Sequence, residues 1–336
     1  MKNIFGKDKV INIVFLGGSI TEGEGASAKD RCFANMTGEW LKEKFGDKLN
    51  YYNKGVGGTP SSYGLLRFER DVAAYNPDMV FIEFAVNDFG KDTRKYVEGI
   101  VRSLIALPTK PYVVFLYTTN ETYDTKTNYF EEVANYYDIP QIYLKDALKR
   151  CLGGENAREA GFLKDKVHPT DKGYEVYYNE VVRCLSKKEY YKRPQKKAQT
   201  LVDDCVRVHT QFLPSCDTKL NGRWEIGENW QGNYIIGAVG DSFEFEFDGD
   251  VLAFEHGLHQ DSAVYEVYDC GELIGTGNPW FNRTTSNQLV LGVNRFNLNP
   301  GYHKIKVVNK ASDVCERANK QVLIYNIITG KKIDEV

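Results

Sequence analysis

The chain has 336 residues, is 42% hydrophobic and carries a formal net charge of -3, so it lacks the basic field that would attract nucleic acid or an anionic membrane. Its apolar runs are too short to span a bilayer, and charged residues near the N-terminus interrupt the apolar stretch that a secretion signal needs. Seven cysteines without a CxxC spacing are typical of thiols in a reducing compartment, and we expect a cytoplasmic protein.

Strand-like and helix-like runs alternate through the first half of the chain. Short, mostly apolar runs predict strands at Val10–Leu16, Leu49–Asn53, Met79–Val86, Tyr112–Tyr117 and Gln141–Tyr143. Runs with helical spacing predict helices at Phe33–Phe45, Ser61–Tyr75, Lys95–Leu107, Tyr129–Tyr137 and Asp171–Leu185. This alternation predicts an α/β domain over residues 1–188, with a parallel sheet covered by helices on both faces.

The second half has the period-two pattern of half-buried strands. Ser242–Phe247 alternates strictly, with its phenylalanines on one face. Similar short runs, separated by turn residues, follow at Val251–Glu255, Ala263–Tyr268, Gln288–Val293, His303–Val308 and Val322–Ile328. The pattern predicts an all-β sandwich over residues 201–336. We interpret the basic, proline-containing segment 189–200 as a linker.

The first predicted strand runs directly into Gly17-Gly18-Ser19. Active sites form at the carboxyl ends of parallel strands, and two glycines permit a tight turn that presents the next side chain. Ser19 is therefore a candidate nucleophile, although a helix N-cap serine is the alternative for this motif alone. A phosphate-binding loop fits badly, because the Gly-Lys-Ser/Thr ending is absent and Glu22 and Glu24 would repel phosphate.

Asp165 and His168 lie on one predicted loop before the last helix of the same domain. A serine hydroxyl needs a base to take its proton, and a carboxylate must hold that base in the right tautomer. An aspartate three residues before a histidine can turn back to the ring, with Asp171 the next candidate for this role. A surface pair or half of a metal site are the alternatives. No other histidine lies in this domain, so we expect no metal and no organic cofactor.

Two further segments, Asn53–Thr59 and Phe84–Asp88, follow predicted strands and should reach the same edge of the sheet. Acyl transfer needs hydrogen-bond donors aimed at a developing oxyanion, and a loop glycine N–H or an asparagine amide can supply them. Taken singly, each segment could equally be an ordinary turn.

These motifs together resemble the SGNH, or GDSL, hydrolases. Gly-Gly-Ser-Ile is similar to their first sequence block, Asn53 to Gly58 to the second, Val86-Asn87-Asp88 to the third and Asp165 to Pro169 to the fifth. The resemblance covers about residues 10–186. It implies a flavodoxin-like domain with a triad and an oxyanion hole: Ser19 as nucleophile, His168 as base, Asp165 as its partner, and the Ser19 and Gly58 N–H groups with the Asn87 amide as oxyanion donors. Gly57 is a rival to Gly58, and Ala85 stands where the family has glycine.

The second half resembles the carbohydrate-binding jelly rolls attached to some carbohydrate esterases. The two-domain order is similar to the mannan acetylesterases of carbohydrate esterase family 17. Aromatic rings stack on sugar faces, so we expect substrate-binding residues in this half, although packing inside the sandwich is the alternative for each. The candidates are Trp280, Phe281, His259 and Trp230, with His256 and Asp261 nearby.

The sequence therefore predicts a serine esterase that removes O-acetyl groups from oligosaccharides. Two other hypotheses stay open: a lipid or thioester hydrolase or acyltransferase with the same triad, and an inactive carbohydrate-binding protein. Against a lipase, the sequence shows no long apolar lid and no amphipathic helix that would seek a membrane. The expected partner is an acetylated oligosaccharide, and the sequence leaves the sugar and the oligomeric state open.

Overall fold

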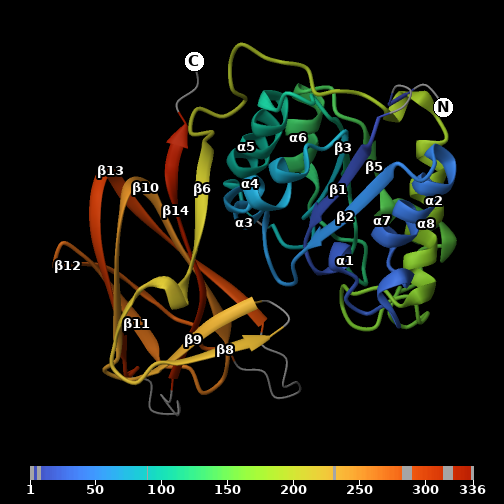
Figure 1. The fold of residues 1–336 in the computed structure, drawn as a ribbon. Coiled ribbons are helices and arrows are strands. Elements are labelled where there is room, and N and C mark those ends of the chain that lie inside the picture. The colour runs from blue at the N-terminus through green and yellow to red at the C-terminus, as the bar shows by residue number, and fades with distance from the viewer. Residues whose placement is uncertain are drawn as a thin grey trace. The chain divides into compact units, whose positions relative to one another are not determined.

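The computed structural model describes residues 4–5, 9–88, 90–229, 232–281, 290–312 and 321–333. The chain divides into two compact units, Met1–Arg207 and Val208–Val336 (Figure 1). Unit 1 is built on a parallel sheet and unit 2 on a separate antiparallel sheet, so the predicted combination of an α/β domain and an all-β domain is confirmed. Within the described ranges, no helix has the length and apolar character needed to cross a membrane.

The sheet of unit 1 has the strand order β2-β1-β3-β4-β5. Its strands are β1 (Ile11–Gly17), β2 (Leu49–Gly55), β3 (Met79–Glu83), β4 (Tyr112–Leu116) and β5 (Gln141–Ile142). Consecutive side chains of β1 are fully buried, which explains its continuous apolar run. Gly17 pairs with both Gly55 and Glu83. Strands β1, β2 and β3 therefore end at one level, and the segments that follow them meet at one edge.

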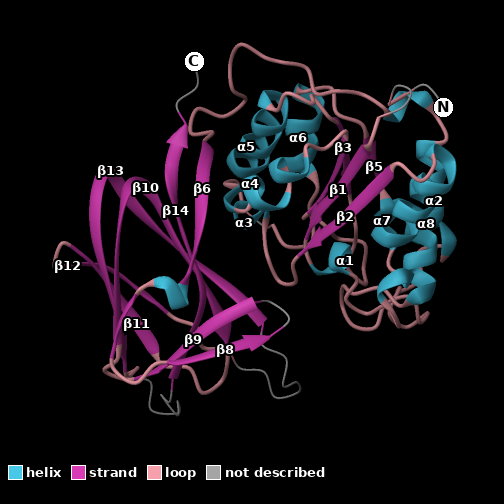
Figure 2. Ribbon diagram, in the orientation of Figure 1, coloured by secondary structure: helices cyan, strands magenta, loops and turns pink. Residues whose placement is uncertain are grey.

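Helices cover both faces of this sheet (Figure 2). In chain order they are α1 (Ser19–Glu22), α2 (Phe33–Phe45), α3 (Ser61–Leu66), α4 (Phe68–Asp71), α5 (Thr93–Ala106), α6 (Asn128–Tyr136), α7 (Leu144–Cys151) and α8 (Asp171–Leu185). Short 3-10 turns are η1 (Lys29–Arg31), η2 (Ala73–Tyr75), η3 (Lys188–Tyr190) and, in unit 2, η4 (Ser215–Asp217). Helices α2, α7 and α8 share one hydrophobic core with β1, β3 and β4.

The prediction of a single helix over Ser61–Tyr75 is wrong. The segment is divided into α3, α4 and η2, with a break at Arg67, where φ is -95° and ψ is 8°. The guanidinium of Arg67 donates to the carbonyl oxygens of Gly17 (2.9 Å) and Lys54 (2.8 Å). Arg67 is fully buried and so satisfies carbonyl groups at the ends of two strands.

Residues 189–200, which we interpreted as a linker, pack along unit 1. Tyr191 is buried, the carbonyl oxygen of Lys192 accepts the Val113 N–H at 3.1 Å, and the Gln195 N–H donates to Tyr137 at 2.9 Å. The boundary between the two units falls between Arg207 and Val208.

Unit 2 contains β6 (Arg207–Pro214), β7 (Lys219–Asn221), β8 (Glu225–Asn229), β9 (Gly232–Ala238), β10 (Ser242–Leu258), β11 (Val264–Asp269), β12 (Glu272–Gly277), β13 (Val290–Lys310) and β14 (Gln321–Ile333). The main path of the sheet runs β12-β11-β13-β10-β14-β9-β8, with β6 on β14 and β7 on β10. The described pairing is antiparallel, and the jelly-roll topology stays a prediction.

The turns predicted after Phe247 and before His303 are wrong as turns. Ser242–Leu258 forms one long strand, β10, and Val290–Lys310 forms another, β13. Gln288 and Leu289, at the start of the predicted strand Gln288–Val293, lie outside the described residues. Gly249 pairs with Gly301, and the register between β10 and β13 shifts just after Gly249. The glycines therefore form an irregularity within a continuous ladder, which bends the strands without ending them.

Candidate active site

Ser19 is the first residue of α1 and follows Gly17, the last residue of β1, and Gly18, the N-cap of α1. A Cβ on Gly17 would collide with the Thr21 hydroxyl, and a Cβ on Gly18 would lie 2.5 Å from Oδ1 of Asn87. Both positions therefore need glycine because other groups approach the backbone closely. The turn leaves Ser19 only 6% exposed, at the carboxyl edge of the sheet.

Ser19, His168 and Asp165 form a continuous chain of polar contacts. Nε2 of His168 lies 2.9 Å from Oγ of Ser19, and Nδ1 lies 2.7 Å from Oδ2 of Asp165. Because an ionised carboxylate can only accept hydrogen bonds, this contact assigns the ring proton to Nδ1. Nε2 is then free to accept the serine proton, which is the arrangement that a Ser-His-Asp nucleophile requires.

Asp165 is held as an ionised acceptor by its own loop. Its Oδ1 accepts the backbone N–H groups of Val167 and His168, each at 2.9 Å. Burial raises the pKa of Asp165, but the hydrogen bonds from His168 and Val167 outweigh burial and hold that pKa below its ordinary value. The carboxylate therefore stays charged at neutral pH.

Contacts from α8 hold the histidine loop against the nucleophile turn. Asp171 accepts the N–H and the hydroxyl of Ser27, at 2.8 and 2.6 Å. The Tyr174 hydroxyl donates to the carbonyl oxygens of Ile20 (3.1 Å) and Glu24 (2.8 Å). Asp171 is therefore engaged with Ser27, and it is Asp165 that lies against His168.

Of the three expected oxyanion donors, the Ser19 N–H and the Asn87 amide lie at the nucleophile turn. Ser19 begins α1, so no earlier turn of the helix accepts its N–H. Oδ1 of Asn87 packs on the Gly18 backbone and accepts no hydrogen bond from the described residues, which orients the opposite end of its amide, Nδ2, away from Gly18. Gly58 follows β2 with a φ of +72°, and Ala85 is absent from the described residues with positive φ. Alanine at position 85, where the family that this segment resembles has glycine, therefore causes no backbone strain.

Two buried carboxyl groups behind this site were not predicted from the sequence. Glu83, at the end of β3, accepts the hydroxyls of Thr21 (2.8 Å) and Thr118 (2.7 Å), and burial raises its pKa. Asp88 accepts the N–H of Ser61 at 3.0 Å, and burial raises its pKa to about 6. The signal that could have identified Glu83 is a charged residue inside the apolar run Phe81–Ala85.

Three of the proposed substrate-binding residues come together on unit 2. The His259 N–H donates to Pro279 at 3.0 Å, and the Phe281 N–H donates to His259 at 3.4 Å, which joins the two loops. Trp280 forms a bridge with His259, and Phe281 is 41% exposed. His256, in contrast, is buried and lies 3.0 Å from the Tyr265 hydroxyl. Trp230 lies outside the described residues.

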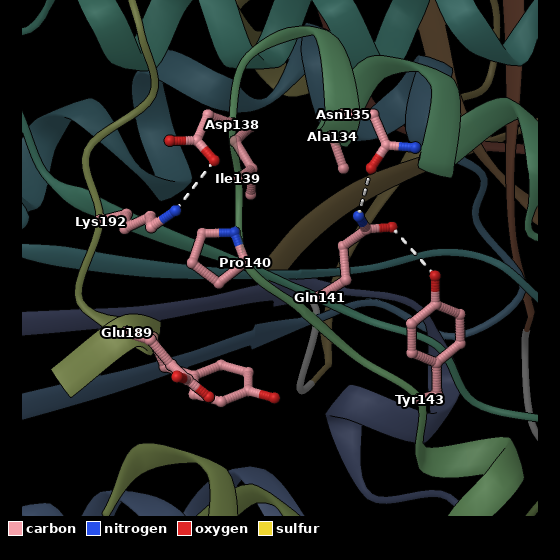
Figure 3. A pocket seen from close by; sticks show the side chains of 10 residues that line it. Ala134, Asn135, Asp138, Ile139, Pro140, Gln141, Tyr143, Glu189 and Lys192 are labelled. Carbon is pink, nitrogen blue, oxygen red and sulfur yellow. Dashed lines mark hydrogen bonds and ion pairs between the residues drawn. The ribbon is translucent and has the colours of Figure 1, made fainter. Parts of the chain in front are cut away.

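A separate hollow of about 540 Å³ lies near β5 of unit 1 (Figure 3). Polar side chains on its walls pair with one another: Lys192 with Asp138 at 2.9 Å, and Gln141 with Asn135 at 2.8 Å. The residues that line this hollow include none of Ser19, Asp165 and His168, so the hollow is separate from the triad. Across the part of the chain that the structure describes, no cluster of three or more His, Cys, Asp or Glu residues could hold a metal ion.

Comparison with known families finds one family model that matches this part of the chain. The model of the GDSL-like Lipase/Acylhydrolase family matches residues 15–176, which include the whole triad and every expected oxyanion donor. No curated protein sequence matches the chain.

Solved structures with a similar fold were also found. Two crystal structures of a two-domain esterase active on acetylated mannans, one co-crystallized with mannopentaose, are 22% and 23% identical to the chain, with a TM-score of 0.78 each. Both matches cover 97% of this chain and 92% of that chain, so the likeness in fold extends over both units. A catalytic mutant of an acetylxylan esterase from Geobacillus stearothermophilus is 17% identical over 57% of this chain and 100% of that chain, with a TM-score of 0.45. Residues 15–176 are therefore similar to the GDSL-like lipases and acylhydrolases, which supports carboxylic ester hydrolase activity.

Proposed function

We propose that the chain is a serine esterase that removes O-acetyl groups from oligosaccharides. The observation that carries the proposal is the contact chain from Ser19 through His168 to Asp165, at 2.9 and 2.7 Å. The proposed oxyanion donors are the Ser19 N–H, the amide of Asn87, whose Oδ1 lies close to Gly18, and the N–H of Gly58 in the loop after β2.

The geometry supports an acyl-enzyme mechanism. Oγ of Ser19 attacks the acetyl carbonyl while His168 takes the hydroxyl proton, and Asp165 stabilises the imidazolium that forms. The oxyanion accepts hydrogen bonds from the Ser19 and Gly58 N–H groups and the Asn87 amide. The tetrahedral intermediate then collapses, and His168 returns the proton to the departing sugar hydroxyl. Water repeats the sequence on the acetyl-enzyme and releases acetate.

Two observations favour an acetylated oligosaccharide as the substrate. The chain shares its two-unit fold with an esterase that acts on acetylated mannans. Unit 2 also brings His259, Trp280 and Phe281 together, and aromatic rings of this kind stack on sugar faces.

The test compares acyl chains first and sugars second. We expect the wild-type chain to hydrolyse p-nitrophenyl acetate much faster than p-nitrophenyl decanoate. Acetylated mannan, xylan, chitin and pectin fragments are then incubated with the chain, and mass spectrometry detects the loss of acetyl groups. Preference for decanoate would favour a lipid hydrolase, and absence of turnover on every ester would favour a binding protein.

A further inference from the structure

Glu83 is a buried carboxyl group at the end of β3 that the proposed mechanism does not use. Strand β3 lies between β1 and β4 in the sheet, and Gly17, the last residue of β1, pairs with Glu83. Glu83 is only 1% exposed, so solvent does not reach its two carboxyl oxygen atoms. A carboxyl group kept out of water needs hydrogen-bond partners within the protein.

The partners are two buried threonine hydroxyls, which come from the strands on either side of β3. Thr21, in α1 after β1, donates to Oε2 of Glu83 at 2.8 Å. Thr118, two residues after the end of β4, donates to Oε1 at 2.7 Å. Each oxygen of the carboxyl group therefore has one partner, and the side chain joins the segments that follow the two neighbouring strands.

The backbone of Glu83 holds the other end of the nucleophile turn. Its carbonyl oxygen accepts the N–H of Gly18, directly before Ser19, at 3.2 Å. Its carboxyl group accepts the hydroxyl of Thr21, two residues after Ser19. One residue therefore contacts the turn on both sides of the nucleophile, through its main chain before Ser19 and through its side chain after it.

The glycine at position 17 makes room for this arrangement. A Cβ on Gly17 would collide with the Thr21 hydroxyl and would lie 2.7 Å from the carbonyl oxygen of Glu83. A larger residue there would push the hydroxyl away from the carboxyl group. The two glycines before Ser19 therefore serve two different contacts, since Gly18 makes room for the Asn87 amide.

We propose that Glu83 is a positioning residue that fixes the turn of residues 18–21, and with it the hydroxyl and the N–H of Ser19. The turn has to hold both groups in place, because the hydroxyl must reach Nε2 of His168 while the N–H faces the oxyanion. Glu83 is too deeply buried to touch a substrate and acts through Gly18 and Thr21. The inference rests on the proposed function, since it assigns a role within that same site.

The role needs two hydrogen-bond contacts and not a charge. A negative charge behind Ser19 would itself oppose an oxyanion. Burial raises the pKa of Glu83, which favours the neutral acid, although the two threonine hydroxyls act in the opposite direction. A hydroxyl can donate or accept, so a glutamine side chain can accept from one threonine and donate to the other. We therefore expect Glu83→Gln to keep the turn in place and Glu83→Ala to release it.

The two threonines provide a matched pair of variants. Thr21→Val and Thr118→Val each replace a buried hydroxyl with a methyl group, and each removes one bond to the same carboxyl group. Only Thr21 lies on the nucleophile turn. A purely structural role for Glu83 would make the two variants lose activity alike, whereas positioning makes the loss larger in Thr21→Val.

The experiment measures turnover of p-nitrophenyl acetate together with the labelling of Ser19 by a fluorophosphonate probe. In labelling, Oγ of Ser19 attacks phosphorus, the P–F bond breaks, fluoride leaves and His168 takes the hydroxyl proton. Neither reaction needs a sugar, so both report on the nucleophile and its surroundings alone. Thermal unfolding of each variant is followed in parallel, so that a loss of activity can be compared with the loss of stability.

We expect Thr21→Val to lower kcat and slow labelling by about tenfold or more, with KM changed less than about twofold. Thr118→Val should keep kcat within about threefold of the wild type. Both variants should lower the unfolding temperature by a similar amount, about 2–6 °C, because each leaves one buried carboxyl oxygen without its partner.

The variants of Glu83 itself test whether it acts through Thr21. Glu83→Gln should stay within about threefold of the wild type in both assays, and Glu83→Ala should lose at least as much kcat as Thr21→Val does. Adding Thr21→Val to Glu83→Ala should cause no further loss of kcat, because the contact is already absent. The comparison of Thr21→Val with Thr118→Val decides the inference even where Glu83→Ala does not fold.

Four results would overturn the inference: wild-type kcat in Thr21→Val, equal losses of kcat in Thr21→Val and Thr118→Val, a loss confined to KM, or equal losses in Glu83→Gln and Glu83→Ala. If the wild type is labelled and cleaves p-nitrophenyl acetate but deacetylates no oligosaccharide, the proposed substrate fails and the threonine comparison still decides the inference. If the probe does not label Ser19 in the wild type, both proposals fail.

Discussion

At Ser19 the proposed chemistry depends on one oxygen atom. Its Oγ contacts Nε2 of His168 at 2.9 Å, and the side chain contributes little to the core. We expect Ser19→Ala to lower kcat on p-nitrophenyl acetate by roughly four to six orders of magnitude, since the variant lacks the nucleophile. The thermal unfolding temperature should stay close to that of the wild type. A clean preparation of the variant with wild-type turnover would remove Ser19 from the mechanism.

Asn87 should act only once negative charge develops on the substrate. Its Oδ1 packs against Gly18, so the opposite end of the amide is the one that can donate to an oxyanion. We expect Asn87→Ala to cost about 2–4 kcal/mol in transition-state stabilisation, almost all of it in kcat. Steady-state kinetics on p-nitrophenyl acetate measure the split. A change confined to KM would instead make Asn87 a residue that positions the ground-state substrate.

Sequence reasoning named the residues whose chemistry is visible in a short motif. Ser19 follows two glycines, and Asp165 precedes His168 by three positions. Glu83 was not recognised, because its bonds to Thr21 and Thr118 depend on how segments far apart in the sequence pack together. Such supporting contacts join distant segments and leave no local pattern.

At the scale of elements, the nucleophile turn is the most constrained segment of unit 1. A Cβ on Gly18 would lie 2.5 Å from Oδ1 of Asn87, whereas Gly90 has open space around it. We expect Gly18→Ala to displace the Asn87 amide and lower kcat by about tenfold or more, while Gly90→Ala leaves kcat unchanged. Turnover of p-nitrophenyl acetate by the two variants is the measurement. Equal activity in both would show that the turn can absorb a methyl group.

The predicted elements were most accurate where one period persists along the sequence. The prediction of Phe33–Phe45 and Asp171–Leu185 as helices is confirmed to the residue. Helix α7 was missed, although Leu144, Ala147 and Leu148 have helical spacing and are buried. Strands β6 to β9 were missed because their residues are mostly half-buried or exposed and lack an apolar run. A strand forms where pairing with other strands buries its side chains, and this burial depends on residues far away in the sequence.

His303 joins several elements of unit 2 and should make its stability depend on pH. Nδ1 lies 2.6 Å from Asp269, and Nε2 lies 3.1 Å from the Gly249 carbonyl oxygen and 3.0 Å from that of Asn299. Acceptors on both sides favour the doubly protonated ring. Burial lowers the pKa of His303, but Asp269 and these carbonyl oxygens outweigh burial and raise that pKa above its ordinary value near 6.5.

The raised pKa of His303 decides how the stability of unit 2 changes with pH. A raised pKa in the folded state gives stabilisation that is complete below about pH 6.5 and is lost as the pH rises through the raised value. We expect the difference in unfolding temperature between the wild type and His303→Gln to be largest at acid pH and to shrink above neutrality. Calorimetric scans across that range measure it. A difference that grows with pH would contradict the assignment.

At the scale of the whole molecule, the two units differ in what their sequences reveal. Unit 1 carries motifs whose order resembles that of a known family, and a family model matches residues 15–176. Unit 2 has a core of alternating aromatic and aliphatic residues, such as Phe243, Phe245 and Phe254, which indicates a sheet but no particular chemistry. Its proposed role therefore rests on which side chains the loops bring together.

That role predicts a difference between large and small substrates. His259, Trp280 and Phe281 lie on two joined loops of unit 2, and p-nitrophenyl acetate is too small to need a second binding surface. Binding energy from a remote part of a substrate helps to position its reacting ester. We therefore expect the double variant Trp280→Ala/Phe281→Ala to lower kcat/KM on acetylated oligosaccharides by about tenfold or more.

Turnover of p-nitrophenyl acetate by the double variant should be unchanged, because that reaction needs only the triad and the oxyanion hole in unit 1. Tyr302→Ala is the matched control, since Tyr302 is an aromatic side chain of the same unit and is 59% exposed. The deciding quantity is the ratio of the two losses in kcat/KM. Equal losses on both substrates would give the two aromatic residues a structural role, and undiminished activity on oligosaccharides would remove this surface from substrate binding.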